Sequence, residues 1–213
     1  LLRPTGLLED MPAFQRGQHS AISAFVTSFD QGVGGDPELS EAADALKTAP
    51  ERGWLHSDFP FIGGSAEGRY REAVDALARY NRAVAESEAP DEGDARELRL
   101  ALLSLHAALG EEAGAVDRMI DDSRAGSADA QYNEVRGSAY AAAMLMRGLR
   151  EDFGTTIGQR QLAATWAETT EALDAVSEKR PTFGVGRQDL VEQGYFLMRG
   201  RESLRTLAAG LAR

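Results

Sequence analysis

Apolar residues recur at a helical spacing through almost the whole sequence, and this spacing constrains the fold more than any other feature. After Pro12, one stripe of positions steps by four, four, three and four residues along the chain: Phe14, Gln18, Ile22, Phe25 and Phe29. Such spacing places side chains on one face of an α-helix, whereas a half-buried strand would show strict alternation. No segment alternates convincingly, so the chain is predicted to be all-α.

The remaining stripes predict a bundle of about six or seven helices. They occupy further segments of the chain: residues 39–46, 70–84, 98–119, 135–153, 162–176 and 190–211. Segment 98–119 keeps a four-three spacing, so one long helix that contains it is expected; a helix of about 30 residues would be roughly 45 Å long at ~1.5 Å per residue. Near-heptad stripes favour long antiparallel helices that cross at shallow angles. The small residues at 137–143 would let a neighbouring helix approach closely.

A single helical domain over residues 1–213 is the expected organisation. The chain of 213 residues is long enough for a sizeable core, and 43% of its residues are hydrophobic, which is typical of globular proteins. The clearest interruption lies at residues 49–64, which contain two prolines and paired glycines. This segment is predicted to be one long loop, and it carries three aromatic residues: Trp54, Phe59 and Phe61.

The charge balance and the absence of cysteine exclude several function classes. The formal net charge is −11, so nucleic-acid phosphates and anionic lipid surfaces would repel the domain. Without cysteine the chain has no disulfide, no catalytic thiolate and no cysteine-bound zinc. No apolar run approaches the roughly 20 residues that a membrane-spanning helix needs. We therefore expect no nucleic-acid partner.

Residues that could carry catalysis or hold a cofactor do not form a recognisable set. The three histidines, His19, His56 and His106, lack the Glu-x-x-His and His-Glu-x-x-His spacings of metal sites. The Gly-x-Gly at residues 184–186 lacks the preceding strand that a phosphate-binding loop requires. We therefore predict no catalytic residue, no metal site and no cofactor, and we expect that the protein is not an enzyme.

Arg201 is the most unusual residue of the pattern, because it interrupts the apolar stripe of segment 190–211. A guanidinium group in such a stripe can reach water along its aliphatic part, pair with a buried carboxylate, or line a cavity that holds an anionic ligand. Glu112 is the candidate partner, because it is the acidic residue in the stripe of segment 98–119. Gly200, directly before Arg201, would let a neighbouring backbone come close.

Four aromatic residues are candidates for lining a pocket: Trp54, Trp166, Tyr140 and Tyr195. Aromatic side chains at helical spacing more often belong to a plain hydrophobic core, so both interpretations stay open. If the domain binds a small molecule, we expect it between helices near Arg201, Trp166 and Tyr195.

An ordered series of short segments resembles one uncharacterised bacterial family, the domain of unknown function 2333. The segments are LLEDMPAFQ at 7–15, DPEL at 36–39 with Ala42 and Ala43, the loop around Trp54, YR at 70–71, YN at 80–81, Tyr132, RG at 136–137, Tyr140, DF at 152–153, Trp166 and QGYFLMR at 193–199. The resemblance therefore extends over nearly the whole chain.

The resemblance implies a helical domain on the periplasmic side of the bacterial inner membrane, tethered by an N-terminal transmembrane segment. It implies no enzymatic activity, no ligand and no catalytic residues. We accordingly expect a non-catalytic domain, the soluble part of a longer anchored protein, which binds another protein of the cell envelope that the sequence does not identify. The alternatives are a sensor domain with a ligand near Arg201, Trp166 and Tyr195, and a cytoplasmic location.

Overall fold

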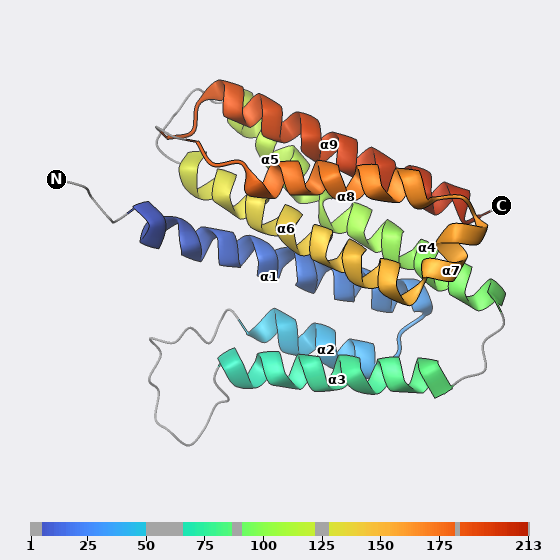
Figure 1. The fold of residues 1–213 in the computed structure, drawn as a ribbon. Coiled ribbons are helices and arrows are strands. Elements are labelled where there is room, and N and C mark those ends of the chain that lie inside the picture. The colour runs from blue at the N-terminus through green and yellow to red at the C-terminus, as the bar shows by residue number, and fades with distance from the viewer. Residues whose placement is uncertain (1–5, 50–65, 87–90, 122–127, 182–183, 213) are drawn as a thin grey trace, which may run out of the picture.

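In a computed structural model, the chain is described over residues 6–49, 66–86, 91–121, 128–181 and 184–212. Within these residues every regular element is an α-helix and no strand occurs, so the predicted all-α bundle is confirmed (Figure 1). The loop predicted at 49–64 lies outside the described residues, apart from Ala49.

The helices follow the breakers of the sequence closely. Their bounds are α1 (Gly6–Val33), α2 (Pro37–Thr48), α3 (Ala66–Glu86), α4 (Asp91–Ala108), α5 (Gly110–Asp121), α6 (Ala128–Asp152), α7 (Gly154–Gln159), α8 (Ala163–Glu178) and α9 (Arg187–Gly210). α1 includes Pro12 instead of beginning after it. No helix among the described residues combines the length and the hydropathy that crossing a membrane requires.

The turn between α1 and α2 shows how the local sequence sets these bounds. Gly34 and Gly35 have φ angles of +100° and +82°, a region that favours glycine, and both N–H groups donate to the Asp30 carbonyl oxygen. The Asp36 carboxylate then accepts from the backbone N–H groups two and three residues later, with Pro37 in the first helical position. The breaker sequence therefore ends one helix and begins the next.

Segment 98–119 is not the single helix that its uninterrupted stripe predicts. α4 ends at Ala108 and α5 begins at Gly110, although backbone hydrogen bonds still cross the junction, from Leu109 N to Leu105 O (3.1 Å) and from Ala113 N to Leu109 O (3.3 Å). The break coincides with a glycine, which has a low helix propensity. The apolar stripe passes through the break because both helices pack against the same core.

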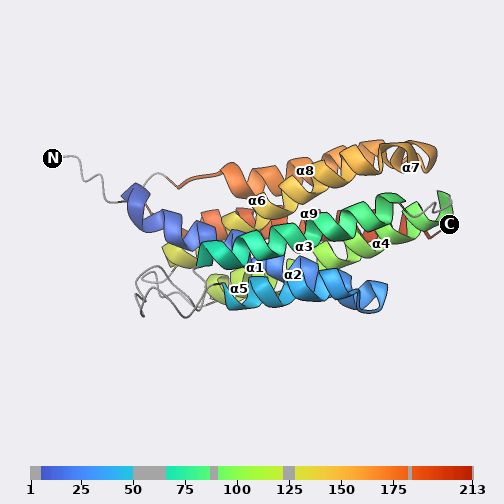
Figure 2. The same ribbon diagram turned by 90° about the horizontal axis from the view of Figure 1, so that it is seen from below.

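α1 lies in the middle of the molecule. On one side it packs against α6 and α4, and on the other it contacts α2, which pairs with α3 (Figure 1). α8 packs against α6, and α9 packs against α8, α4 and α5. Seen from below, α6 and α8 form one edge, α2 lies toward the opposite edge and α3 lies between them (Figure 2).

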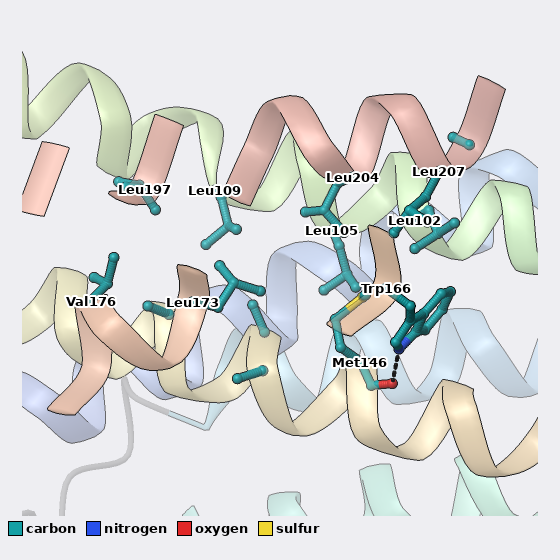
Figure 3. Close-up of a cluster of buried hydrophobic side chains, with 14 of the residues drawn as sticks. Leu102, Leu105, Leu109, Met146, Trp166, Leu173, Val176, Leu197, Leu204 and Leu207 are labelled. Atoms are coloured by element: carbon teal, nitrogen blue, oxygen red, sulfur yellow. Dashed lines mark hydrogen bonds between the residues drawn. The ribbon is translucent and has the colours of Figure 1, made fainter. Parts of the chain in front are cut away.

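The main core fills the space between α4, α6, α8 and α9. Its fully buried side chains include a ladder of leucines from α4 and α9 together with Met146, Leu173 and Trp166 (Figure 3). The Trp166 indole N–H donates to the Met146 carbonyl oxygen at 3.1 Å, which satisfies the one polar atom of this side chain. A smaller cluster, rich in alanine, joins α1, α2 and α3.

α1 and α6 make the most extensive contact between described helices, and they touch backbone to backbone. A Cβ atom added at Gly17 would lie 1.8 Å from the Glu134 carbonyl oxygen, and one at Gly137 would lie 2.0 Å from the Phe14 carbonyl oxygen. The close approach predicted for residues 137–143 is therefore confirmed, and the neighbour is α1.

Candidate functional site

Arg201 binds the backbone at the break between α4 and α5. Its Nε donates to the His106 carbonyl oxygen at 3.3 Å, in the last turn of α4, and a Cβ at Gly110 would lie 3.4 Å from its Nη2. Carbonyl groups in the last turn of a helix lack intrahelical partners and carry the negative end of the helix dipole, so a guanidinium is favourable there. Burial, followed by the charges of Arg201 and Arg205, lowers the pKa of the His106 imidazole.

Glu112 and Arg201 do not form the predicted ion pair. The Glu112 carboxyl is buried, with 6% of the residue exposed, and its Oε1 contacts Ser138 Oγ at 2.8 Å. The reason is the break at Gly110, where Arg201 binds backbone, whereas Glu112 on α5 faces α6. The apolar spacing correctly placed Glu112 and Arg201 on helix faces that contact other helices, but the predicted ion pair between them is wrong.

Burial is the main influence on the pKa of the Glu112 carboxyl. Burial raises the pKa of the carboxyl above its ordinary value of 4.5, hydrogen bonds from Ser138 and from the Glu112 backbone oppose this, and the charges of Glu111 and Glu134 raise the pKa slightly further. Ser138 Oγ also lies 3.0 Å from the Gly17 carbonyl oxygen. A hydroxyl has one proton to donate, so Glu112 Oε1 and the Gly17 carbonyl oxygen share Ser138 Oγ as their donor, and among the described residues Glu112 Oε2 has no hydrogen-bond partner.

The aromatic residues expected around a pocket do not come together. Trp166 is buried in the core, while Tyr140 on α6 and Tyr195 on α9 are exposed and pack against Phe14 and Phe196 respectively. Tyr140 and Trp166 line two different depressions. Trp54 lies outside the described residues. Trp166 therefore follows the plain-core interpretation.

Arg136 is a buried cation whose structural role was not predicted from the sequence. Its Nε and Nη2 donate to the Ser177 carbonyl oxygen (3.1 and 2.9 Å) near the end of α8, and its Nη1 donates to Asn133 Oδ1 at 2.7 Å. The guanidinium also lies over the Phe14 ring at 5.6 Å from the ring centre. Its only signal in the sequence is an arginine directly before the small residues at 137–143.

A groove between α1 and α6 presents apolar side chains at the surface. We call it the α1–α6 groove; its volume is about 370 Å³ and its lining comprises Gln18, Ile22, Phe25, Tyr140, Ala141, Met144, Leu145, Gly148, Leu149 and Asp152. Tyr140 and Met144 are 40% and 47% exposed, which is high for large apolar residues. Phe25, Leu145 and Leu149 are partly buried against the main core and form the floor of the groove.

The other depressions and side-chain groups of the described residues are weaker candidates for a functional site than the α1–α6 groove. A larger hollow along α1, of about 540 Å³, is lined by small and neutral polar side chains with His19 and Lys47 at its edge. No group of three or more histidine, aspartate or glutamate side chains within the described ranges could hold a metal ion. The α1–α6 groove is therefore the candidate site.

Comparisons of the chain with family models, with curated proteins and with solved structures find no match. The resemblance to the domain of unknown function 2333 family stays a prediction.

Proposed function

We propose that this domain is a non-catalytic interaction module, which binds another protein through the α1–α6 groove. The observation that carries the proposal is the exposure of Tyr140 and Met144 above an apolar floor. Exposed apolar patches are typical of interaction sites, and aromatic residues and methionine are enriched in them. The flexible thioether of methionine also adapts its shape to a partner.

The contacts of the charged side chains inside the bundle also support a non-catalytic role. The charged groups with unusual surroundings, Arg136, Arg201 and Glu112, bind backbone carbonyls or neighbouring side chains and leave no reactive set facing a cavity. A location on the periplasmic side of the inner membrane, with a protein of the cell envelope as partner, belongs to the proposal through the family resemblance alone. A ligand near Arg201, Trp166 and Tyr195 has less support, because these residues do not line a common cavity in the described part of the chain.

Site-specific photo-crosslinking in the producing cells tests the proposal. A photoreactive amino acid would replace Met144 in the groove, and a matched control would replace Met198 on α9, which is 49% exposed and likewise contacts an arginine three residues later. Covalent adducts with one protein from position 144 and none from position 198 support the groove as the binding surface. Equal labelling from both positions, or adducts from position 198 only, contradicts it.

A further inference from the structure

Of the described residues that line the α1–α6 groove, Asp152 at one end is the only charged one. Among the described residues this carboxylate has no ion pair and no side-chain hydrogen bond. Asp152 is the last residue of α6, and α7 begins two residues later at Gly154. The carboxylate of Asp152 makes this end of the groove attractive for a cation.

The positive charges of α6 do not neutralise this end. Arg147 and Arg150 line a different depression, on the side of α6 that faces α8. Arg147 pairs there with Asp174 at 2.6 Å, and its Nη1 also contacts Met144 Sδ at 3.7 Å, eight residues before the end of α6. At the other end of the groove Gln18 is neutral. The groove is therefore apolar along its length and negative at one end.

The dimensions of the groove suit a helix. Tyr140 and Leu149 are nine residues apart on α6, which corresponds to about 14 Å at ~1.5 Å per residue. Apolar residues at positions i, i+4 and i+7 of a partner helix span about 10 Å at ~1.5 Å per residue and fit within this length, and they are the usual pattern for a helix in a groove. Asp152 lies one further turn along, level with position i+11 of such a helix.

Resting on the proposed function, we propose that the partner presents an amphipathic helix with three apolar anchors and a lysine or arginine one turn beyond them, opposite Asp152. Charge favours a partner of this kind over a second copy of the chain, because each copy has a formal net charge of −11 and would repel another.

A helix library displayed on phage tests this partner chemistry. Positions i, i+4, i+7 and i+11 of a designed helix would be randomised and selected on the 213-residue chain. Parallel selections would use Met144→Glu in the groove, Asp152→Lys at its end and Met198→Glu as the matched surface control. All three residues are exposed, and circular dichroism would confirm that each variant is folded.

We expect apolar residues at the first three positions and lysine or arginine at the fourth, both on the wild-type chain and on Met198→Glu. Met144→Glu should abolish the enrichment. Asp152→Lys should shift the fourth position to aspartate or glutamate and weaken binding of a lysine-ended peptide at least tenfold.

Three results would overturn the inference. The first is a selection in which the wild-type chain enriches no helix sequences beyond those enriched on Met144→Glu. The second is a selection in which Asp152→Lys enriches the same residue at the fourth position as the wild-type chain does. The third is a dimer in sedimentation that Met144→Glu dissociates, which would assign the groove to a second copy. If binding depends on Met144 but not on the charge at position 152, the partner chemistry is wrong while the groove remains a binding surface. The proposed function is judged separately by the crosslinks, and it fails if position 144 gives no adduct or labels no more than position 198.

Discussion

Gly137→Ala is the most direct test of the close crossing between α1 and α6. The added methyl group would lie 2.0 Å from the Phe14 carbonyl oxygen and 3.0 Å from Gln18 N. Carbon and oxygen atoms in favourable contact stay about 3.3 Å apart or more. Because the obstructing atoms belong to the backbone of α1, rotation of a side chain cannot relieve the overlap, and the two helices must move apart by about 1 Å.

We expect a net loss of about 3 kcal/mol in the free energy of unfolding. Inserting a methyl group into a packed interior typically costs about 1–3 kcal/mol, and a rigid backbone obstacle places this site near the upper end. Separating the helices also weakens the bond between Ser138 Oγ and the Gly17 carbonyl oxygen, worth about 1 kcal/mol. The better helix propensity of alanine returns about 1 kcal/mol.

Gly148→Ala is the matched control, because Gly148 lies on the same helix but has no atom near a Cβ position within 4 Å. This variant should be more stable than the wild type by about 0.5–1 kcal/mol, since alanine lowers the entropy of the unfolded chain and favours helix. Urea unfolding followed by far-ultraviolet circular dichroism measures both variants, with the slope of the transition confirming that the folded state is the same.

A stability of Gly137→Ala within about 0.5 kcal/mol of Gly148→Ala would refute the reasoning, because the two sites would then differ in nothing but position. The pair Gly17→Ala and Gly137→Ala sharpens the test. Both methyl groups force open the same crossing, so the double variant should lose clearly less stability than the two single losses combined.

Three further predictions concern the buried Glu112 and Arg136 and the partly buried Arg201. Glu112→Gln should remove a pH dependence of stability: because the folded pKa of Glu112 is raised, the unfolded chain loses its proton first, and wild-type stability should fall relative to the variant as the pH rises above about 4.5. Equal pH profiles for wild type and Glu112→Gln in urea unfolding would contradict this. Arg201→Met should cost about 1 kcal/mol through loss of the helix-end contact, whereas Arg205→Met, whose partner Glu202 is on the surface, should change little in the same assay. Arg136→Met should cost about 3 kcal/mol or more because it leaves the Ser177 carbonyl oxygen and Asn133 Oδ1 without the hydrogen bonds that Arg136 donates, and a thermal midpoint equal to that of wild type would exclude this role.

The fold class and most helix positions follow from the apolar spacing because packing in a bundle depends on which face of each helix is apolar. The stripe that includes Leu102 and Leu105 does form the main core. The division between α4 and α5 could not be predicted from that stripe, because apolar spacing reports the buried face and not the continuity of backbone hydrogen bonds. Gly110 marks the break, but isolated glycines are often tolerated within helices.

The partner of Arg201 could not be predicted from the sequence for a related reason. The spacing placed Arg201 and Glu112 within the apolar stripes of their helices, and a charged side chain in such a stripe suggests a side chain of opposite charge as its partner. The actual partner is the His106 carbonyl oxygen, a backbone group that every residue has, and it is available only because α4 ends there. Ser138, which contacts Glu112, is the one small residue of its run with a polar side chain, but the apolar spacing does not show which helix its hydroxyl faces.

The groove and the close crossing are two consequences of one packing arrangement. At Gly17 and Gly137 the absence of side chains lets the two backbones touch. Further along the same pair of helices, Phe25 and Leu149 are too large for such contact, so they form a partly buried floor between the helices. A methyl group at Gly137 would separate the helices at the crossing and change the width of the α1–α6 groove with it. Residues that stabilise the fold therefore also shape the surface proposed to bind the partner.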